Sequence, residues 1–223
     1  MKQLDRFRNA KGEIWLNVAS STHVLEDFVN LDNNLFLRLL PYSGVVGKIL
    51  PKKYQASLAE YRQAKQKAHL LQHDCRAPLD FPDGSVEHIL CSHFLEHVYP
   101  AEMESIVRDF HRVLKNNGTL HIIVPDLKDQ AERYLQRYKE GMADAADEFV
   151  KETLLSMEGR GTLKYRMLEL NGGFGLQHRW MYDAPSMVAR LVKAGFSILD
   201  ENHTPSQSYR LNDGSVHIVA CKQ

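Results

Sequence analysis

The segment His88–Asp126 constrains the fold more strongly than any other part of the chain. A short apolar run, Ile89–Cys91, leads into a polar corner, a helical pattern follows, and a second apolar run occupies Thr119–Val124. Two apolar runs joined by a helix predict a β-α-β crossover and therefore a parallel sheet. Because ligands lie beyond the carboxyl ends of the strands in such sheets, the polar corner Ser92–His97 is the first place to look for function.

The helix of this unit is predicted to run from about Pro100 to Lys115. Its apolar residues recur at intervals of three and one, which places them on a single helical face. These residues are Met103, Ile106, Val107, Phe110, Val113 and Leu114. Pro100 suits the first turn, where a missing N–H costs nothing. Asn116, Asn117 and Gly118 are expected to end the helix, with Gly118 in the left-handed conformation.

Further strands are predicted on both sides of this unit. Glu13–Val18 and Phe28–Leu31 are short apolar runs separated by too few residues for a helix, so a parallel pair would need a shortened crossover. Near the other end of the chain, a helix with an Asp cap and a Gly stop is expected over Asp183–Ala194. The last two apolar runs, Phe196–Asp200 and Ser215–Cys221, predict an antiparallel hairpin.

These elements predict an α/β fold with a doubly wound, mostly parallel sheet and a C-terminal antiparallel β-hairpin. We expect residues 1–223 to form one domain with insertions at about 33–70 and 140–175. In the first insertion, Tyr54–Leu71 has the pattern of a helix and Ser43–Lys48 that of a loop.

Charge and composition exclude some classes of function. Lys plus Arg and Asp plus Glu both number 28, which argues against general nucleic-acid binding through a basic surface. No apolar run approaches the roughly 18 residues of a membrane span, and the first residues lack the apolar core of a signal peptide. Cys75, Cys91 and Cys221 are scattered, so we expect reduced thiols in a cytoplasmic protein.

Two carboxylates, Asp32 and Asp74, each follow a short apolar run. At neighbouring strand ends of a nucleotide-binding sheet, one could accept the ribose hydroxyls and the other the adenine amine. The alternative is that each aspartate is a helix cap or a loop residue. The two aspartates come in order along the chain with Ser92 at the next strand end, and this order favours a nucleotide-binding site. No G-x-G-x-x-G or G-x-x-x-x-G-K-[ST] motif is present, which disfavours NAD enzymes and P-loop NTPases.

His93, Glu96 and His97 match H-x-x-E-H, the inverted zinc-peptidase motif. On a helix the two histidines would share one face and could bind zinc. However, the motif follows a buried strand, Pro100 interrupts any long helix, and no downstream carboxylate is identifiable as the third ligand. We therefore expect no metal here and interpret these residues as the lining of a cleft.

The segment Gln177–Tyr182 crowds His, Arg and Trp side chains just before a capped helix. This crowding suggests a ligand-facing surface, whereas the alternative is that Trp180 and Tyr182 pin a loop to the core. Both interpretations hold if Trp180 is packed against the core and His178 faces the cleft.

Five segments stand in a characteristic order and spacing: LNV (16–18), FVNLD (28–32), HDCRAPLDFPDGSVEHILCSHFLEHV (73–98), RVLKNNGTLHIIVPDL (112–127) and HRWMYD (178–183). Together they resemble the class I S-adenosylmethionine-dependent methyltransferases. More narrowly, they are similar to the small predicted methyltransferases linked to surface-polysaccharide or glycan pathways. The resemblance implies a Rossmann-like methyltransferase fold and S-adenosylmethionine as the cofactor.

The resemblance also implies roles for individual residues. Asp32 corresponds to the ribose-binding acid, and Asp74 with its neighbours to the adenine site. His93 and His178 are the candidate catalytic bases. The residues implied in cofactor binding are Asn17, Ala19, Ser20, Ser21, Asp32, Asp74, Cys75, Arg76 and Ser92. Those implied on the acceptor side are Glu96, His97 and Trp180.

One departure from the family pattern concerns the loop after the first strand. This loop is normally G-x-G, and here it is Ala19-Ser20-Ser21. A non-glycine residue in the left-handed region costs roughly 1–2 kcal/mol, so the loop either binds cofactor at some cost or marks a protein that has lost it.

The leading hypothesis from the sequence is a methyltransferase acting on an oxygen or nitrogen of a small-molecule or glycan-like acceptor. The alternatives are a catalytically degenerate binding or scaffold protein and a zinc hydrolase using His93, Glu96 and His97.

Overall fold

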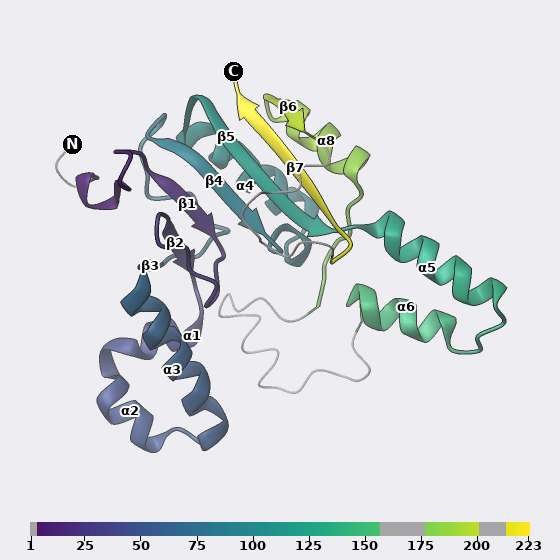
Figure 1. Ribbon diagram of the computed structural model, residues 1–223, viewed down its shortest axis with the longest axis horizontal. Helices are drawn as coiled ribbons and strands as arrows, with labels where there is room; N and C mark the ends of the chain where they lie inside the picture. The colour runs from purple at the N-terminus through teal and green to yellow at the C-terminus, as the bar shows by residue number, and fades with distance from the viewer. Residues whose placement is uncertain (1–3, 157–176, 201–212) are drawn as a thin grey trace.

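The computed structural model describes residues 4–156, 177–200 and 213–223, and its centre is a seven-stranded sheet (Figure 1). The strand order is β3-β2-β1-β4-β5-β7-β6. Neighbouring strands from β3 to β5 are parallel, and β7 runs antiparallel to both β5 and β6. The mostly parallel sheet with its C-terminal antiparallel hairpin is therefore confirmed. The strands are β1 (Trp15–Val18), β2 (Val29–Asp32), β3 (His69–Gln72), β4 (Val86–Ser92), β5 (Leu114–Pro125), β6 (Phe196–Asp200) and β7 (Ser215–Lys222).

The helices form two groups at the ends of the sheet and a layer against it. Figure 1 shows α1, α2 and α3 gathered beyond the β3 edge, while α5 and α6 extend together from the end of β5. Within the described residues, no helix is long and apolar enough to cross a bilayer. The α-helices are α1 (Leu35–Leu39), α2 (Ser43–Ile49), α3 (Lys52–Lys67), α4 (Pro100–Val113), α5 (Leu127–Lys139), α6 (Ala145–Thr153) and α8 (Ala184–Lys193). The 3₁₀ helices are η1 (Asp5–Phe7), η2 (Leu40–Tyr42) and η3 (Leu95–His97).

The first predicted insertion, residues 33–70, differs from expectation in two places. The segment expected to be a loop, Ser43–Lys48, is helical and belongs to α2. The helix predicted to reach Leu71 ends at Lys67, because Ala68 is extended and the next four residues pair with β2 as β3. Pairing with an exposed sheet edge overrides the helical pattern of this segment. Of the second insertion, residues 157–176 lie outside the described residues.

The turn after α4 also differs from the prediction. The helix ends at Val113 and the chain enters β5 at once, so Gly118 does not cap it. Asn117, with φ 63°, holds the left-handed conformation instead. Gly118 is required for another reason, because a Cβ there would lie 2.8 Å from the carbonyl oxygen of Lys115. The segment is a tight excursion within β5 rather than a helix cap.

The shortened crossover between β1 and β2 is confirmed, and two buried asparagines support it. The side-chain amide of Asn17 donates to Asn30 Oδ1 and to the carbonyl oxygen of His23, both at 2.9 Å. The same Oδ1 of Asn30 accepts from the backbone N–H of Leu25 at 2.9 Å, and its amide donates back to Leu25 O at 3.0 Å. These bonds satisfy the connection's polar groups where a crossover helix would have satisfied its own. Asn17 therefore lies beneath the loop that follows β1.

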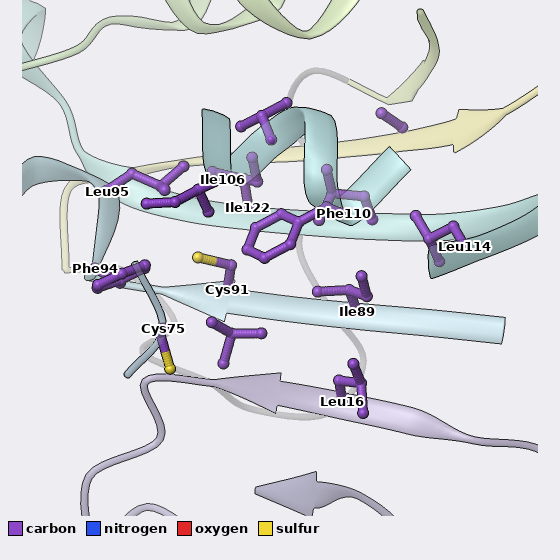
Figure 2. Close-up of a cluster of buried hydrophobic side chains, with 14 of the residues drawn as sticks. Leu16, Cys75, Ile89, Cys91, Phe94, Leu95, Ile106, Phe110, Leu114 and Ile122 are labelled. Atoms are coloured by element: carbon purple, nitrogen blue, oxygen red, sulfur yellow. The ribbon is translucent and has the colours of Figure 1, made fainter. Parts of the chain in front are cut away.

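The core is packed between α4 and the central strands. The predicted apolar face of α4 is buried, and Figure 2 shows the ring of Phe110 lying over β4 beside Cys91 and Ile89, with Ile122 of β5 nearby. Phe110 is 1% exposed. This packing holds β4 and β5 in place and so sets the position of their carboxyl ends.

Truncation of Phe110 tests the role of this packing. We expect Phe110→Ala to lower the free energy of unfolding by about 3–5 kcal/mol, because it removes a fully buried aromatic ring and leaves a cavity. Val192→Ala on α8 is the control; this side chain is exposed, so its loss should change stability by no more than about 0.5 kcal/mol. Denaturant unfolding measures both, and equal effects would contradict the packing described here.

Candidate active site

Backbone hydrogen bonds tie together the carboxyl ends of the first three strands. The N–H of Ser20 donates to Leu31 O at 2.9 Å, and the N–H of His73 donates to Asp32 O at 2.9 Å. The N–H of Ser21 donates to Asp32 Oδ2, also at 2.9 Å. The predicted loop residues and the predicted ribose-binding acid are therefore neighbours.

The glycine-free loop adopts the conformation that glycine usually supplies. Ala19 has φ 56° and Ser21 has φ 50°, both in the left-handed region. Each costs roughly 1–2 kcal/mol relative to an ordinary conformation. Such strain persists only where the surroundings over-determine it, and it clusters at functional sites. The bond from Ser21 to Asp32 is one of the contacts that hold the loop in this shape.

Asp32 is the centre of a small polar network. Its Oδ1 accepts from the N–H of Asn34 at 2.7 Å and from the hydroxyl of Tyr61 at 3.3 Å, while Oδ2 accepts from Ser21. Burial raises the pKa of Asp32, and these hydrogen bonds act in the opposite direction. Since a carboxylate offers about four lone-pair directions, Asp32 keeps room for a further donor.

Tyr61 is a part of the site that the sequence did not reveal. It belongs to α3, and its place in a helical stripe indicated only packing. Its hydroxyl lies 3.3 Å from Ser21 Oγ as well as from Asp32, so it contacts both the loop and the acid. A tyrosine hydroxyl in an insertion becomes a candidate only when the fold brings it to the strand ends.

The predicted adenine site consists of a clamped acid and a buried thiol. Arg76 Nε and Nη2 donate to Asp74 Oδ1 and Oδ2 at 3.0 and 2.8 Å. This side-chain bonding to Arg76 lowers the pKa of Asp74. Cys75 is 2% exposed, and burial raises the pKa of its thiol to about 12. Cys75 therefore stays a neutral thiol.

The end of β4 carries the second half of the candidate site. Ser92 is the last residue of β4, and His93 follows it with φ 49°, in the left-handed region. His93 Nδ1 lies 3.2 Å from Glu96 Oε1. Its Nε2 lies 3.3 Å from Ser215 Oγ and 3.6 Å from Asp213 Oδ2. His93 thus links the β4 end to the beginning of β7.

Residues 177–182 pack directly onto this corner. The N–H groups of Arg179 and Trp180 both donate to the carbonyl oxygen of Glu96, at 2.7 and 3.1 Å. The N–H of His178 donates to Leu154 O at 2.9 Å. The corner after β4, the end of α6 and the segment before α8 are therefore joined, although they are far apart in the sequence.

The exposures of His178 and Trp180 are the reverse of the expectation. Trp180, expected to be packed, is 44% exposed, while His178, expected to face a cleft, is 7% exposed. Burial is the main cause that lowers the pKa of His178, which therefore favours the neutral imidazole. Its ring lies 4.9 Å from that of His97 in an edge-to-face arrangement.

The inverted zinc-peptidase arrangement is not formed. The motif spans the end of β4 and the 3₁₀ helix η3, so His93 and His97 do not share the face of an α-helix. Instead, Glu96 and His97 come together with His178, and one possible ligand atom from each lies within 4.8 Å of the others. The third member of this cluster is therefore His178, from the segment before α8, which the sequence did not reveal.

Comparison with known proteins agrees with this architecture. Residues 37–122 match the family described as a methyltransferase domain. The matched part begins after β2, so it leaves out the loop at Ala19 and the acid Asp32. The search of curated proteins found no match.

Several solved structures share the fold. One is a SAM-dependent methyltransferase from Methanosarcina mazei, with 17% identity, a TM-score of 0.51, and coverage of 94% of this chain and 92% of that one. A second is a protein from Pyrococcus horikoshii OT3, with 15% identity, a TM-score of 0.52, and coverage of 95% and 82%.

A third is a chain from the complex between the Haloferax volcanii Trm112 methyltransferase activator and a methyltransferase. It has 11% identity and a TM-score of 0.51, with coverage of 99% of this chain and 87% of that one. At these identities the likeness concerns the fold alone. The chain therefore combines a methyltransferase-domain match over residues 37–122 with a fold that a solved SAM-dependent methyltransferase shares.

Proposed function

We propose that this protein transfers a methyl group to an oxygen or nitrogen atom of a small-molecule or glycan-like acceptor. The cofactor would lie over the carboxyl ends of β1, β2 and β3, and the acceptor would lie at the end of β4. The observation that supports this most strongly is the left-handed backbone at Ala19 and Ser21. The loop keeps the backbone conformation of a glycine loop at a cost in conformational free energy. Such a cost is expected of a loop that still binds the cofactor.

The residues at the strand ends fit the chemistry of the cofactor. Asp32 has a free acceptor direction for a ribose hydroxyl, and the long hydroxyl contact from Tyr61 can be exchanged for a second one. Asp74 and the backbone of Cys75 would meet the adenine edge. When bound, S-adenosylmethionine supplies an electrophilic methyl group on a sulfonium centre. The protein then needs mainly to hold an acceptor atom in line with that group.

His93 is the candidate general base for a hydroxyl acceptor. Its side chain is 16% exposed, it directly follows β4, and its two nitrogens face Glu96 on one side and Ser215 on the other. An imidazole that takes a proton through one nitrogen is stabilised by a carboxylate at the other. His178 is more deeply buried, which favours a role in positioning rather than in direct proton transfer.

Isothermal titration with S-adenosylmethionine and S-adenosylhomocysteine tests the cofactor site. We expect saturable binding, and Asp32→Ala should weaken it by at least about tenfold, since a hydrogen bond to a charged group contributes about 1.5–3 kcal/mol. Asp27→Ala is the matched control, because Asp27 is an exposed acid in the connection that precedes β2. Absence of heat at millimolar ligand would favour a scaffold protein, and unchanged affinity in Asp32→Ala would remove Asp32 from the site.

Restoring glycine to the loop tests whether the strain is real. Ala19→Gly removes a left-handed cost of roughly 1–2 kcal/mol but adds about 0.5–1 kcal/mol of unfolded-state entropy, so a net stabilisation of about 0.5–1 kcal/mol is expected. Ala189→Gly, at an exposed position within α8, should instead destabilise by about 1 kcal/mol. Thermal or denaturant unfolding measures both. Destabilisation by Ala19→Gly would contradict the left-handed conformation of Ala19.

A further inference from the structure

We propose that Glu96, His97 and His178 form a binding site for a divalent transition-metal ion. One ligand atom from each side chain lies within 4.8 Å of the other two. Around an ion with metal–ligand distances of about 2.0–2.2 Å, ligand atoms sit about 3.4 Å apart. The three ligand atoms would therefore draw closer together when the ion binds.

The cluster contains a buried carboxylate, Glu96, whose Oε1 lies 3.2 Å from His93 Nδ1 but which accepts no hydrogen bond from the described residues. Glu96 is 1% exposed, and neither carboxylate oxygen accepts a hydrogen bond from any residue that the structure describes. Leaving a carboxylate buried and unsatisfied is costly, and buried charges are normally paired or coordinated to a metal. A cation between Glu96 and the two histidines would remove this cost.

The second unsatisfied atom belongs to a histidine and points to the same ligand. His178 is 7% exposed, and its Nδ1 has no hydrogen-bond partner within the described parts of the chain. The backbone of Thr153 hydrogen-bonds to this ring. Metal-binding histidines characteristically use one ring nitrogen for a backbone carbonyl or carboxylate and the other for the ion.

His97 shows the same division between its two ring nitrogens. Its Nδ1 lies 3.3 Å from the carbonyl oxygen of Gln177. Donation to that carbonyl places the ring proton on Nδ1 and leaves the lone pair on Nε2. Both histidines are therefore oriented by the main chain, as ligands of a metal ion would be.

The corner that carries these ligands is held by several segments. The carbonyl oxygen of Glu96 accepts from two N–H groups of the segment that contains His178, so the ligands from η3 and from residues 177–180 are held together. His93 Nδ1, at 3.2 Å from Glu96 Oε1, is placed to orient the carboxylate from outside the ligand set. Such supporting contacts are typical of metal-binding carboxylates.

Two imidazoles and one carboxylate select for particular ions. This ligand set suits Zn²⁺, Mn²⁺ or Fe²⁺ and leaves coordination positions open, whereas Mg²⁺ prefers oxygen ligands and water. The next step rests on the proposed function. If that function holds, an open coordination position of the ion, at the end of β4, would receive an oxygen or nitrogen of the acceptor. The ion would then orient that atom and ease loss of its proton.

Metal binding to the full chain, stripped with a chelator and dialysed, tests the proposal without cofactor or acceptor. Equilibrium dialysis with elemental analysis should give one Zn²⁺ per chain, weaker binding of Mn²⁺ and much weaker binding of Mg²⁺. Glu96→Gln and His178→Ala should each weaken Zn²⁺ binding by about 100-fold or more. Zn²⁺ should also raise the melting temperature of the unmodified chain but not that of Glu96→Gln.

His69→Gln is the matched control, because His69 is an exposed histidine on β3 outside the cluster; its Zn²⁺ affinity should equal that of the unmodified chain. Stoichiometry well below one, equal affinity in Glu96→Gln, or Mg²⁺ binding as tight as Zn²⁺ would each overturn the metal site. Titration of S-adenosylmethionine into the same preparations separates the two proposals. Cofactor binding without metal binding refutes only the metal site, and metal binding without cofactor binding refutes only the proposed function.

Discussion

The hydrogen bond from the Ser21 N–H to the Asp32 carboxylate is the interaction on which the proposed cofactor side of the structure depends. It joins the loop after β1 to the end of β2, and the backbone of Asp32 in turn holds His73 after β3. A loop without glycine would relax out of the left-handed region if nothing held it there. Here the acceptor on β2, together with the Tyr61 hydroxyl, supplies that restraint. The same oxygens that hold the loop are the ones that would face a ribose.

The short connection between β1 and β2 is the second condition for this arrangement. A parallel pair normally needs a crossover of a dozen or more residues. In this chain the buried amides of Asn17 and Asn30 satisfy the polar groups of a connection that contains no helix. Because the connection is anchored within the sheet layer, the loop that begins it is presented at the strand ends. Asn17, which the resemblance places among the cofactor-binding residues, supports the loop through its side-chain hydrogen bonds.

The predictable part of the molecule is the part that local periodicity determines. The apolar face of α4 and the capped helix α8 follow from spacing and punctuation, as do the strands that end at Asp32 and Ser92. The unpredictable part depends on contacts between distant segments. Residues 69–72 leave the helical pattern because an open sheet edge pairs with them. His178 is buried, and Trp180 exposed, because their segment docks on the carbonyl oxygen of Glu96. No pattern within either segment encodes that contact.

The two halves of the candidate site differ in how far the protein satisfies their carboxylates with hydrogen bonds. On the proposed cofactor side, Asp32 and Asp74 already accept hydrogen bonds from several donors of the protein, so a ligand there would add to these bonds or exchange with them. On the β4 side, Glu96 is more deeply buried and accepts no hydrogen bond from the described residues. Its ion-pair contact is with His93, at 3.2 Å, and buried carboxylates are normally completed by hydrogen bonds or by a cation. The side where both carboxylate oxygens lack a hydrogen bond is therefore where a second component of the reaction would have the most to contribute.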